Sequence, residues 1–276
     1  MPQGWRVSDA LTLTTALTSP PDGRVPPDTA AWQATLDEAR AALARLAVRR
    51  AGAGPFRVTD HDVRRALGRD VSEKEEPFAW SARTARRTFG LAAVRALLAG
   101  EARTPHDAVR GRLRDSDGAV REGSRTSSQL DRWVAALPAA GRSAVAAEAV
   151  TWATRLWCAL DWSALGPAPV IGRDHWWDSP HSALLALRGR ADVRAGRAHL
   201  VVLSGPRRDS VRSELALVTL VESLRSREGA APGPVVGWWP DSGHIVRVDP
   251  HPTVLTLATD AVALVLAAGP SARAAA

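Results

Sequence analysis

The order of elements in residues 187–248 restricts the fold of this chain more than any other feature of the sequence. A short, continuous apolar run at His199–Leu203 is typical of a strand that is covered on both faces. After a polar break, apolar residues at helical spacing predict a mostly buried helix from about Ser210 to Arg227. Two runs rich in β-branched residues, Val235–Trp239 and His244–Val248, then flank the turn sequence Pro-Asp-Ser-Gly and predict a β-hairpin. This succession of a strand, a helix and two strands indicates an α/β fold.

A glycine and an aspartate stand just before the apolar strand, in the sequence Gly189-Arg190-Ala191-Asp192. A strand that ends in Gly-x-x-Asp, followed by a second strand, a helix and a further strand pair, resembles the PD-(D/E)XK nuclease superfamily, in particular its RecB-like branch. The resemblance covers roughly residues 145–268 and implies an N-terminal helical region packed on a small mixed β-sheet of restriction-endonuclease type. It also implies that Asp192 ligates Mg²⁺, with a second acid at the end of the next strand and a lysine two positions later.

The second motif of that family, Asp/Glu-x-Lys, is missing from the next strand. Leu203 stands in the position of the acid, and Gly205 stands in the position of the lysine. The only lysine of the chain is Lys74, so no shift of register restores the motif. An arginine cannot replace this lysine as a base, because the guanidinium group does not deprotonate in proteins. We therefore expect a catalytically degenerate, nuclease-like protein that binds nucleic acid or serves as a subunit of an assembly.

Two other functions stay open on the sequence alone. The first is a metal-dependent DNA nuclease with a relocated active site, since Mg²⁺ needs several oxygen ligands and other carboxylates could join Asp192. In that case Asp192 and Glu214 are the candidate catalytic residues, Asp192 is the metal ligand and Mg²⁺ is the cofactor; otherwise no cofactor is expected. Glu148 and Asp209 are further carboxylates that could complete such a site. The second alternative is a protein-interaction module that binds no nucleic acid.

Two clusters of arginines are candidate nucleic-acid-binding surfaces, because guanidinium groups bind phosphates. The first cluster lies at i, i+3 and i+4 of a predicted helix that follows Ser81, and the second stands at the start of the helix after the apolar strand. Their members are Arg83, Arg86 and Arg87 in the first cluster and Arg207, Arg208 and Arg212 in the second. The alternative for both clusters is a solvated helix face. For the second cluster, pairing with nearby acids such as Asp209 and Glu214 is a further alternative.

The chain carries 36 basic and 29 acidic residues, which gives a net charge of +7. All but one of the basic residues are arginines, and this choice together with abundant alanine is typical of a GC-rich genome. Codon usage does not explain the positive sign, which favours an anionic partner. The single cysteine, Cys158, excludes an intramolecular disulfide and favours a cytoplasmic location. No apolar run approaches the roughly 20 residues of a membrane span, so no membrane contact is expected.

Composition along the chain predicts four segments. Residues 1–27 are expected to be an irregular N-terminal arm, residues 28–165 a helical region, residues 166–270 the nuclease-like α/β core and residues 271–276 a disordered tail. Within the helical region, the polar sequence Asp115-Ser116-Asp117-Gly118 predicts a turn that ends the helix before it.

The 11 tryptophans include two adjacent pairs, Trp176-Trp177 and Trp238-Trp239. Neighbouring residues on a strand point to opposite faces, so one member of each pair is expected in the core and the other is expected to be partly exposed. An exposed tryptophan can stack against a nucleic-acid base or anchor a protein partner. A helix that covers the second tryptophan is the simpler alternative.

Overall fold

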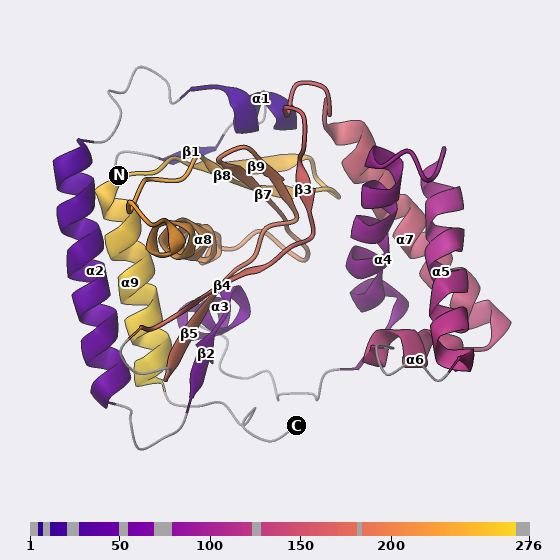
Figure 1. The fold of residues 1–276 in the computed structure, drawn as a ribbon, viewed down its shortest axis with the longest axis horizontal. Coiled ribbons are helices and arrows are strands. Elements are labelled where there is room, and N and C mark those ends of the chain that lie inside the picture. Colours follow the sequence, from indigo (N-terminus) through magenta and orange to yellow (C-terminus); the bar gives the residue numbers. More distant parts are fainter. Residues whose placement is uncertain are drawn as a thin grey trace. The chain divides into compact units, whose positions relative to one another are not determined.

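The computed structural model describes residues 5–7, 12–20, 28–49, 55–68, 79–122, 128–180 and 184–268. The chain forms two compact units, the first made of Met1–Glu73 and Ser163–Ala276 and the second of Lys74–Trp162 (Figure 1). The helical region that the sequence predicts at 28–165 is therefore divided, because the helices near its start belong to the same unit as the strands. The tail predicted at 271–276 lies outside the described residues.

Among the described residues, the first unit contains a six-stranded sheet in the order β1-β9-β8-β7-β6-β3. Its strands are β1 (Trp5–Val7), β3 (Val170–Ile171), β6 (Val193–Ala195), β7 (Ala198–Val202), β8 (Val235–Trp239) and β9 (His244–Val248). Strands β6 and β7 form an antiparallel hairpin, β8 lies parallel to β7, and β9 returns antiparallel to β8. Helix α8 (Val211–Arg225) connects the two parallel strands. The expected α/β class with a mixed sheet is therefore confirmed.

Strands β7, β8 and β9 form the buried centre of this sheet, and every residue in them is buried. Figure 1 shows α8 on one side of the sheet and α1 (Leu13–Thr18) on the other, and α1 contacts β7 and β8. Cover on both faces explains the continuous apolar runs at residues 200–202 of β7 and along β8. The N-terminal segment, which the sequence presents as an irregular arm, adds the edge strand β1 through antiparallel pairing with β9.

A second, three-stranded sheet belongs to the same unit. It has the order β2-β5-β4, with β2 (Phe56–Val58) parallel and β4 (His175–Asp178) antiparallel to the central strand β5 (Leu185–Gly189). One face of this sheet packs on α8. At Gly189, a Cβ atom would lie 3.0 Å from Cγ1 of Val221 on α8. The glycine of the Gly-x-x-Asp sequence therefore lets the helix lie close against β5.

Helices α2 (Thr29–Arg49), α3 (Asp60–Leu67) and α9 (Pro252–Ala267) complete the first unit. Helix α9 packs against all three of α2, α3 and α8. The largest fully buried aliphatic side chains of this core are leucines, namely Leu36, Leu43, Leu185, Leu187, Leu215, Leu217, Leu220 and Leu255. The core holds the first turns of α3 and α8 in fixed positions, and these turns carry acidic residues of the candidate site.

The second unit is helical throughout its described part, with α4 (Ala82–Leu98), α5 (Pro105–Arg121), α6 (Gln129–Ala135) and α7 (Ala139–Ala159). The turn that the sequence predicts at residues 115–118 is wrong, since α5 continues through it. Ser116 is fully buried there, and its hydroxyl donates to Oδ1 of Asp131 at 2.8 Å. Arg112 donates to the same oxygen at 2.7 Å. This buried network favours the helix over the local turn preference of the sequence.

Candidate functional site

Asp192 lies between β5 and β6, at the start of the hairpin. Its backbone N–H donates to the carbonyl oxygen of Leu200 at 2.7 Å, so it lies beside β7. The strand that the sequence predicts to end at Asp192 is divided, because β5 ends at Gly189 in the three-stranded sheet and β6 begins at Val193. Its side chain is fully buried, and Oδ2 accepts the backbone N–H of Val202 at 2.7 Å. The Asp192 carboxylate therefore links the start of β6 to the end of β7.

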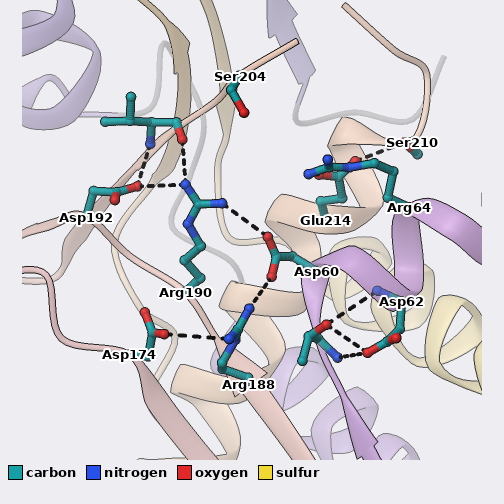
Figure 2. Close-up of polar contacts among 12 residues, drawn as sticks. Asp60, Asp62, Arg64, Asp174, Arg188, Arg190, Asp192, Ser204, Ser210 and Glu214 are labelled. Carbon is teal, nitrogen blue, oxygen red and sulfur yellow. Dashed lines mark hydrogen bonds and ion pairs between the residues drawn. The ribbon is translucent and has the colours of Figure 1, made fainter. Parts of the chain in front are cut away.

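An arginine neutralises this buried carboxylate (Figure 2). Nη2 of Arg190 lies 3.4 Å from Oδ2 of Asp192 and donates to the carbonyl oxygen of Val202 at 2.7 Å. Its other terminal nitrogen, Nη1, donates to Oδ2 of Asp60 at 3.3 Å. Burial by itself would lower the pKa of the Arg190 guanidinium, but the carboxylates of Asp192 and Asp60 raise it. Arg190 is therefore a permanent cation between two acids.

Asp60 is the first residue of α3, and a second arginine, Arg188, also binds its carboxylate. Nη2 of Arg188 donates to Oδ1 of Asp60 at 2.9 Å. The side chain of Thr59 caps this helix in a reciprocal pair with Asp62, which fixes the position of Asp60 at the positive end of the helix dipole. Burial favours the neutral acid, but Arg190 and Arg188 outweigh burial and hold the pKa of Asp60 far below its usual value.

Glu214, in the first turn of α8, forms a separate group of contacts in Figure 2. Arg208 donates to both of its oxygens, from Nε and from Nη2, at 2.7 Å each. Arg64 donates at 3.1 Å, and the hydroxyl of Ser210 donates at 2.9 Å. Burial would raise the pKa of Glu214, but the hydrogen bonds from Arg208 and the charge of Arg64 lower it. Glu214 is thus a buried anion that accepts hydrogen bonds from Arg208, Arg64 and Ser210. The donors to Asp192 are other residues, so the two carboxylates do not form one site.

The residues at this edge of the sheet do not fit a Mg²⁺ ion. Magnesium takes oxygen ligands in octahedral geometry, whereas an arginine and a backbone N–H bind the Asp192 carboxylate. Leu203 lies in the apolar core with α8 and offers no oxygen from its side chain. Gly205 has a φ of +77°, a conformation that a lysine would adopt only with strain. In the part of the chain that the structure describes, no group of three or more His, Cys, Asp or Glu residues could hold a metal ion.

The structure separates the members of the second arginine cluster. Arg207 is exposed, but Arg208 is engaged by Glu214 and also donates to the carbonyl oxygens of Ser204 and Pro206. Arg212 is half-buried. Pairing with a nearby acid, the alternative to phosphate binding in this cluster, therefore holds for Arg208.

The first arginine cluster lies on α4 in the second unit and is also divided. Nη1 of Arg86 donates to Oε2 of Glu148 on α7 at 3.1 Å. Arg87 is half-buried, and Arg83 is exposed. Arg83 is thus the exposed member of this cluster, as Arg207 is of the other.

A further group of polar side chains joins β4, β6, β7 and α8, and no sequence pattern indicates it. Arg194 and His199 are buried in it, and His175 and Glu222 are half-buried. Nδ1 of His175 lies 2.7 Å from Oε1 of Glu222, and Nε2 of His199 lies 3.8 Å from Oε2 of the same carboxylate. Arg194 donates to Glu222 at 3.3 Å. Burial lowers the pKa of His199 to about 4, although the charge of Glu222 opposes this shift. Burial likewise lowers the pKa of His175.

Sequence patterns do not single out Asp60, Arg188 or Arg190 as site residues. The two arginines could have been noticed from their position, because they stand on either side of Gly189 in the Gly-x-x-Asp sequence. No local pattern indicates that α3, which lies more than a hundred positions earlier in the chain, brings an acid to them.

Comparisons with family models, with curated proteins and with solved structures give no match to this chain. No helix in the described residues is long and apolar enough to cross a membrane. Function is therefore inferred below from the positions and charges of the chain's own residues.

Proposed function

We propose that this chain is a catalytically inactive protein of PD-(D/E)XK type, similar to the RecB-like branch, whose scaffold binds nucleic acid. The hairpin β6–β7, the crossover helix α8 and the parallel strand β8 support this proposal. They follow one another in the element order of that nuclease core. Asp192 stands at the start of the hairpin, and the resemblance implies that this residue corresponds to the first metal-binding acid.

The proposed absence of catalysis rests on one observation. Arg190 contacts the carboxylates of both Asp192 and Asp60. A nuclease of this type needs carboxylates that are open to a metal ion and a lysine beside them. In this chain a guanidinium group supplies the positive charge in place of a metal. Because an arginine does not deprotonate, it cannot act as the base that activates water.

The charge of the chain supports nucleic acid as the ligand. Asp60, Asp192 and Glu214 are each paired with arginines, so these acids repel a phosphate backbone less than free carboxylates would. The net charge of +7 and the exposed Arg207 beside the same edge favour an anion. Counterion release then makes the affinity depend on salt.

Binding and cleavage can be measured with the same fluorescein-labelled oligonucleotides, single-stranded and double-stranded. We expect the affinity, followed by fluorescence anisotropy, to fall steeply between roughly 50 and 200 mM salt. We expect no cleavage above background with Mg²⁺ or Mn²⁺. The matched control is Asp192→Asn, which keeps an oxygen acceptor for the Val202 N–H and removes the acid.

Each contrary result favours one of the other two functions. Cleavage by the natural chain that disappears in Asp192→Asn identifies a metal-dependent nuclease and overturns the proposal. Absence of binding at the lowest salt concentration also overturns it, and a protein-interaction module then becomes the better description.

A further inference from the structure

The outer face of the three-stranded sheet combines one exposed tryptophan with two arginines. Burial alternates along β4, so that His175 and Trp177 are less exposed than Trp176 and Asp178. His175 contacts Glu222 on α8, and Trp177 packs against the apolar core, so Trp176 points to the opposite face. At 39% exposure, Trp176 is one of the few large apolar side chains in the described residues that solvent reaches to this extent.

Two arginines, one from each of the other two strands of this sheet, lie near the indole ring of Trp176. Cζ of Arg57 on β2 lies 5.6 Å from the ring centroid of Trp176, and Cζ of Arg188 on β5 lies 6.0 Å from it. The register places Trp176 opposite Arg188, and it places Arg57 opposite Ala186. Because Ala186 is small, Arg57 can extend over β5 to the tryptophan. We call Arg57, Trp176, Ala186 and Arg188 the sheet platform.

The two arginines of the sheet platform differ in how they are held. Arg188 donates to Asp60 at 2.9 Å and lies 3.9 Å from Asp174, so its guanidinium is fixed. Arg57 is exposed and forms no ion pair with any residue that the structure describes. Arg57 is therefore a cation that can turn to a ligand at the cost of its contact with the Trp176 ring and of no ion pair.

We infer that the sheet platform binds single-stranded nucleic acid, with a base stacked on Trp176 and a phosphate bound by Arg57. This inference rests on the proposed function and adds the class of nucleic acid and its place on the chain. Every base has a π-face that can stack on an aromatic side chain, but in a duplex that face is already stacked. A guanidinium group beside the ring then matches the phosphate that accompanies each base.

The composition of the face favours this ligand over a protein partner. An aromatic anchor of a protein interface usually lies in a desolvated apolar pocket. Around Trp176 the outward-facing neighbours are Arg57, Arg188 and Ala186, and the face bears the exposed carboxylate of Asp178 near its edge. Arg57 is the cation of this face that has no acid partner among the described residues, whereas Arg188 is held by Asp60 and lies near Asp174. Asp178 opposes an anionic ligand at the edge of the face.

The test uses a fluorescein-labelled oligothymidylate of about 16 nucleotides, which covers the site size of known single-strand-binding modules. Trp176→Ala should weaken binding roughly tenfold, since stacking of one base is worth about that factor. Trp176→Phe keeps a π-face and should retain most of the affinity. A duplex of the same length should bind the natural chain and Trp176→Ala with similar affinity.

Charge changes on the same face give independent readouts. Arg57→Ala should reduce the slope of log affinity against log salt by about 0.7, the value for one phosphate contact on a single strand. Arg45→Ala, on an exposed position of α2, removes the same charge and should leave the slope unchanged. Asp178→Asn should strengthen binding, because it removes the carboxylate from the face.

The outcomes separate this inference from the function on which it rests. If the natural chain binds no single-stranded DNA at low salt, the proposed function and the sheet platform both fail. If it binds, and Trp176→Ala and Arg57→Ala both bind with unchanged affinity and slope, the sheet platform is overturned and the proposed function stands. Circular dichroism checks the fold of each variant, and Arg57→Ala carries the test if Trp176→Ala does not fold.

Discussion

Two regions of the first unit use arginine in opposite ways. At the start of the hairpin, Arg190 is 16% exposed and is bound to two carboxylates and a carbonyl oxygen. On the sheet platform, Arg57 is exposed and its described contact is the ring of Trp176. The residue type is the same, and the two regions are connected through Arg188, which binds Asp60 and also lies over Trp176.

The difference shows that burial and pairing decide what an arginine can do. A buried charge is costly unless a partner neutralises it, so Arg190 and its acids must remain together for the chain to fold. An exposed charge costs little when it is unpaired and can exchange water for a phosphate. The arginine between Asp192 and Asp60 is therefore structural, whereas the arginine of the sheet platform is exposed.

The largest expected effect comes from removing the buried cation. Arg190→Met leaves Asp192 and Asp60 buried without this charge, and we expect a loss of about 3–5 kcal/mol in the free energy of unfolding. Arg57→Ala on the sheet platform should change it by less than about 0.5 kcal/mol. Chemical denaturation followed by circular dichroism measures both values.

A double variant shows whether the lost stability arises from the uncompensated acid. Asp192→Asn in the Arg190→Met background removes one of the two buried charges and keeps the acceptor for Val202. It should recover part of the lost stability. If Arg190→Met is as stable as Arg57→Ala, the comparison between a structural and a ligand-binding arginine is broken.

The histidines beside Glu222 should make the stability of the first unit depend on pH. The pKa of His199 is about 4 in the folded chain and 6.5 in the unfolded chain, so the unfolded chain binds more protons between these values. Stability is therefore complete above pH 6.5 and falls as the pH decreases towards 4, by about 3 kcal/mol at most from this residue. His199→Gln should flatten this part of the pH profile of unfolding.

Other charged groups face the same histidine, so the control must isolate its contribution. Glu222 faces it from α8, Arg194 from β6 and His175 from β4. Arg225 on α8 acts on His175. The pKa of His175 is also lowered, so His199→Gln should leave a residual slope. His106→Gln, at an exposed position of α5, should leave the profile unchanged. A profile of His199→Gln that equals that of the natural chain would contradict the assignment.

The smallest expected effect compares two adjacent arginines of the second cluster. Arg208→Ala removes the paired hydrogen bonds to buried Glu214 and should cost about 1–3 kcal/mol of stability. Arg207→Ala should change stability by less than about 0.5 kcal/mol and should reduce the salt slope of DNA binding instead. Equal losses of stability in the two variants would show that burial does not distinguish them.

Local patterns in the sequence predict the central elements closely. The strand expected at His199–Leu203 is β7 at Ala198–Val202, and the helix expected from about Ser210 to Arg227 is α8 at Val211–Arg225. Both strands of the expected hairpin have the predicted bounds. These elements are predictable because apolar runs and turn residues act over a few neighbouring positions. The position of Asp192 beside β7 follows from the same patterns.

The partners of Asp60 and Arg57 were decided by the tertiary structure alone. Asp60 meets Arg188 and Arg190 across 128 and 130 positions of the chain, because α3 packs against α8. Arg57 reaches Trp176 because β2 pairs with β5. The sequence by itself determined the strand, the helix and the hairpin, and the absence of an acid at Leu203 and of a lysine at Gly205. Pairing of Arg208 with Glu214 was open to the sequence because the two residues are six positions apart. Neutralisation of Arg188 and Arg190 depended on long-range packing, since charge pairing acts through space between elements that the core brings together.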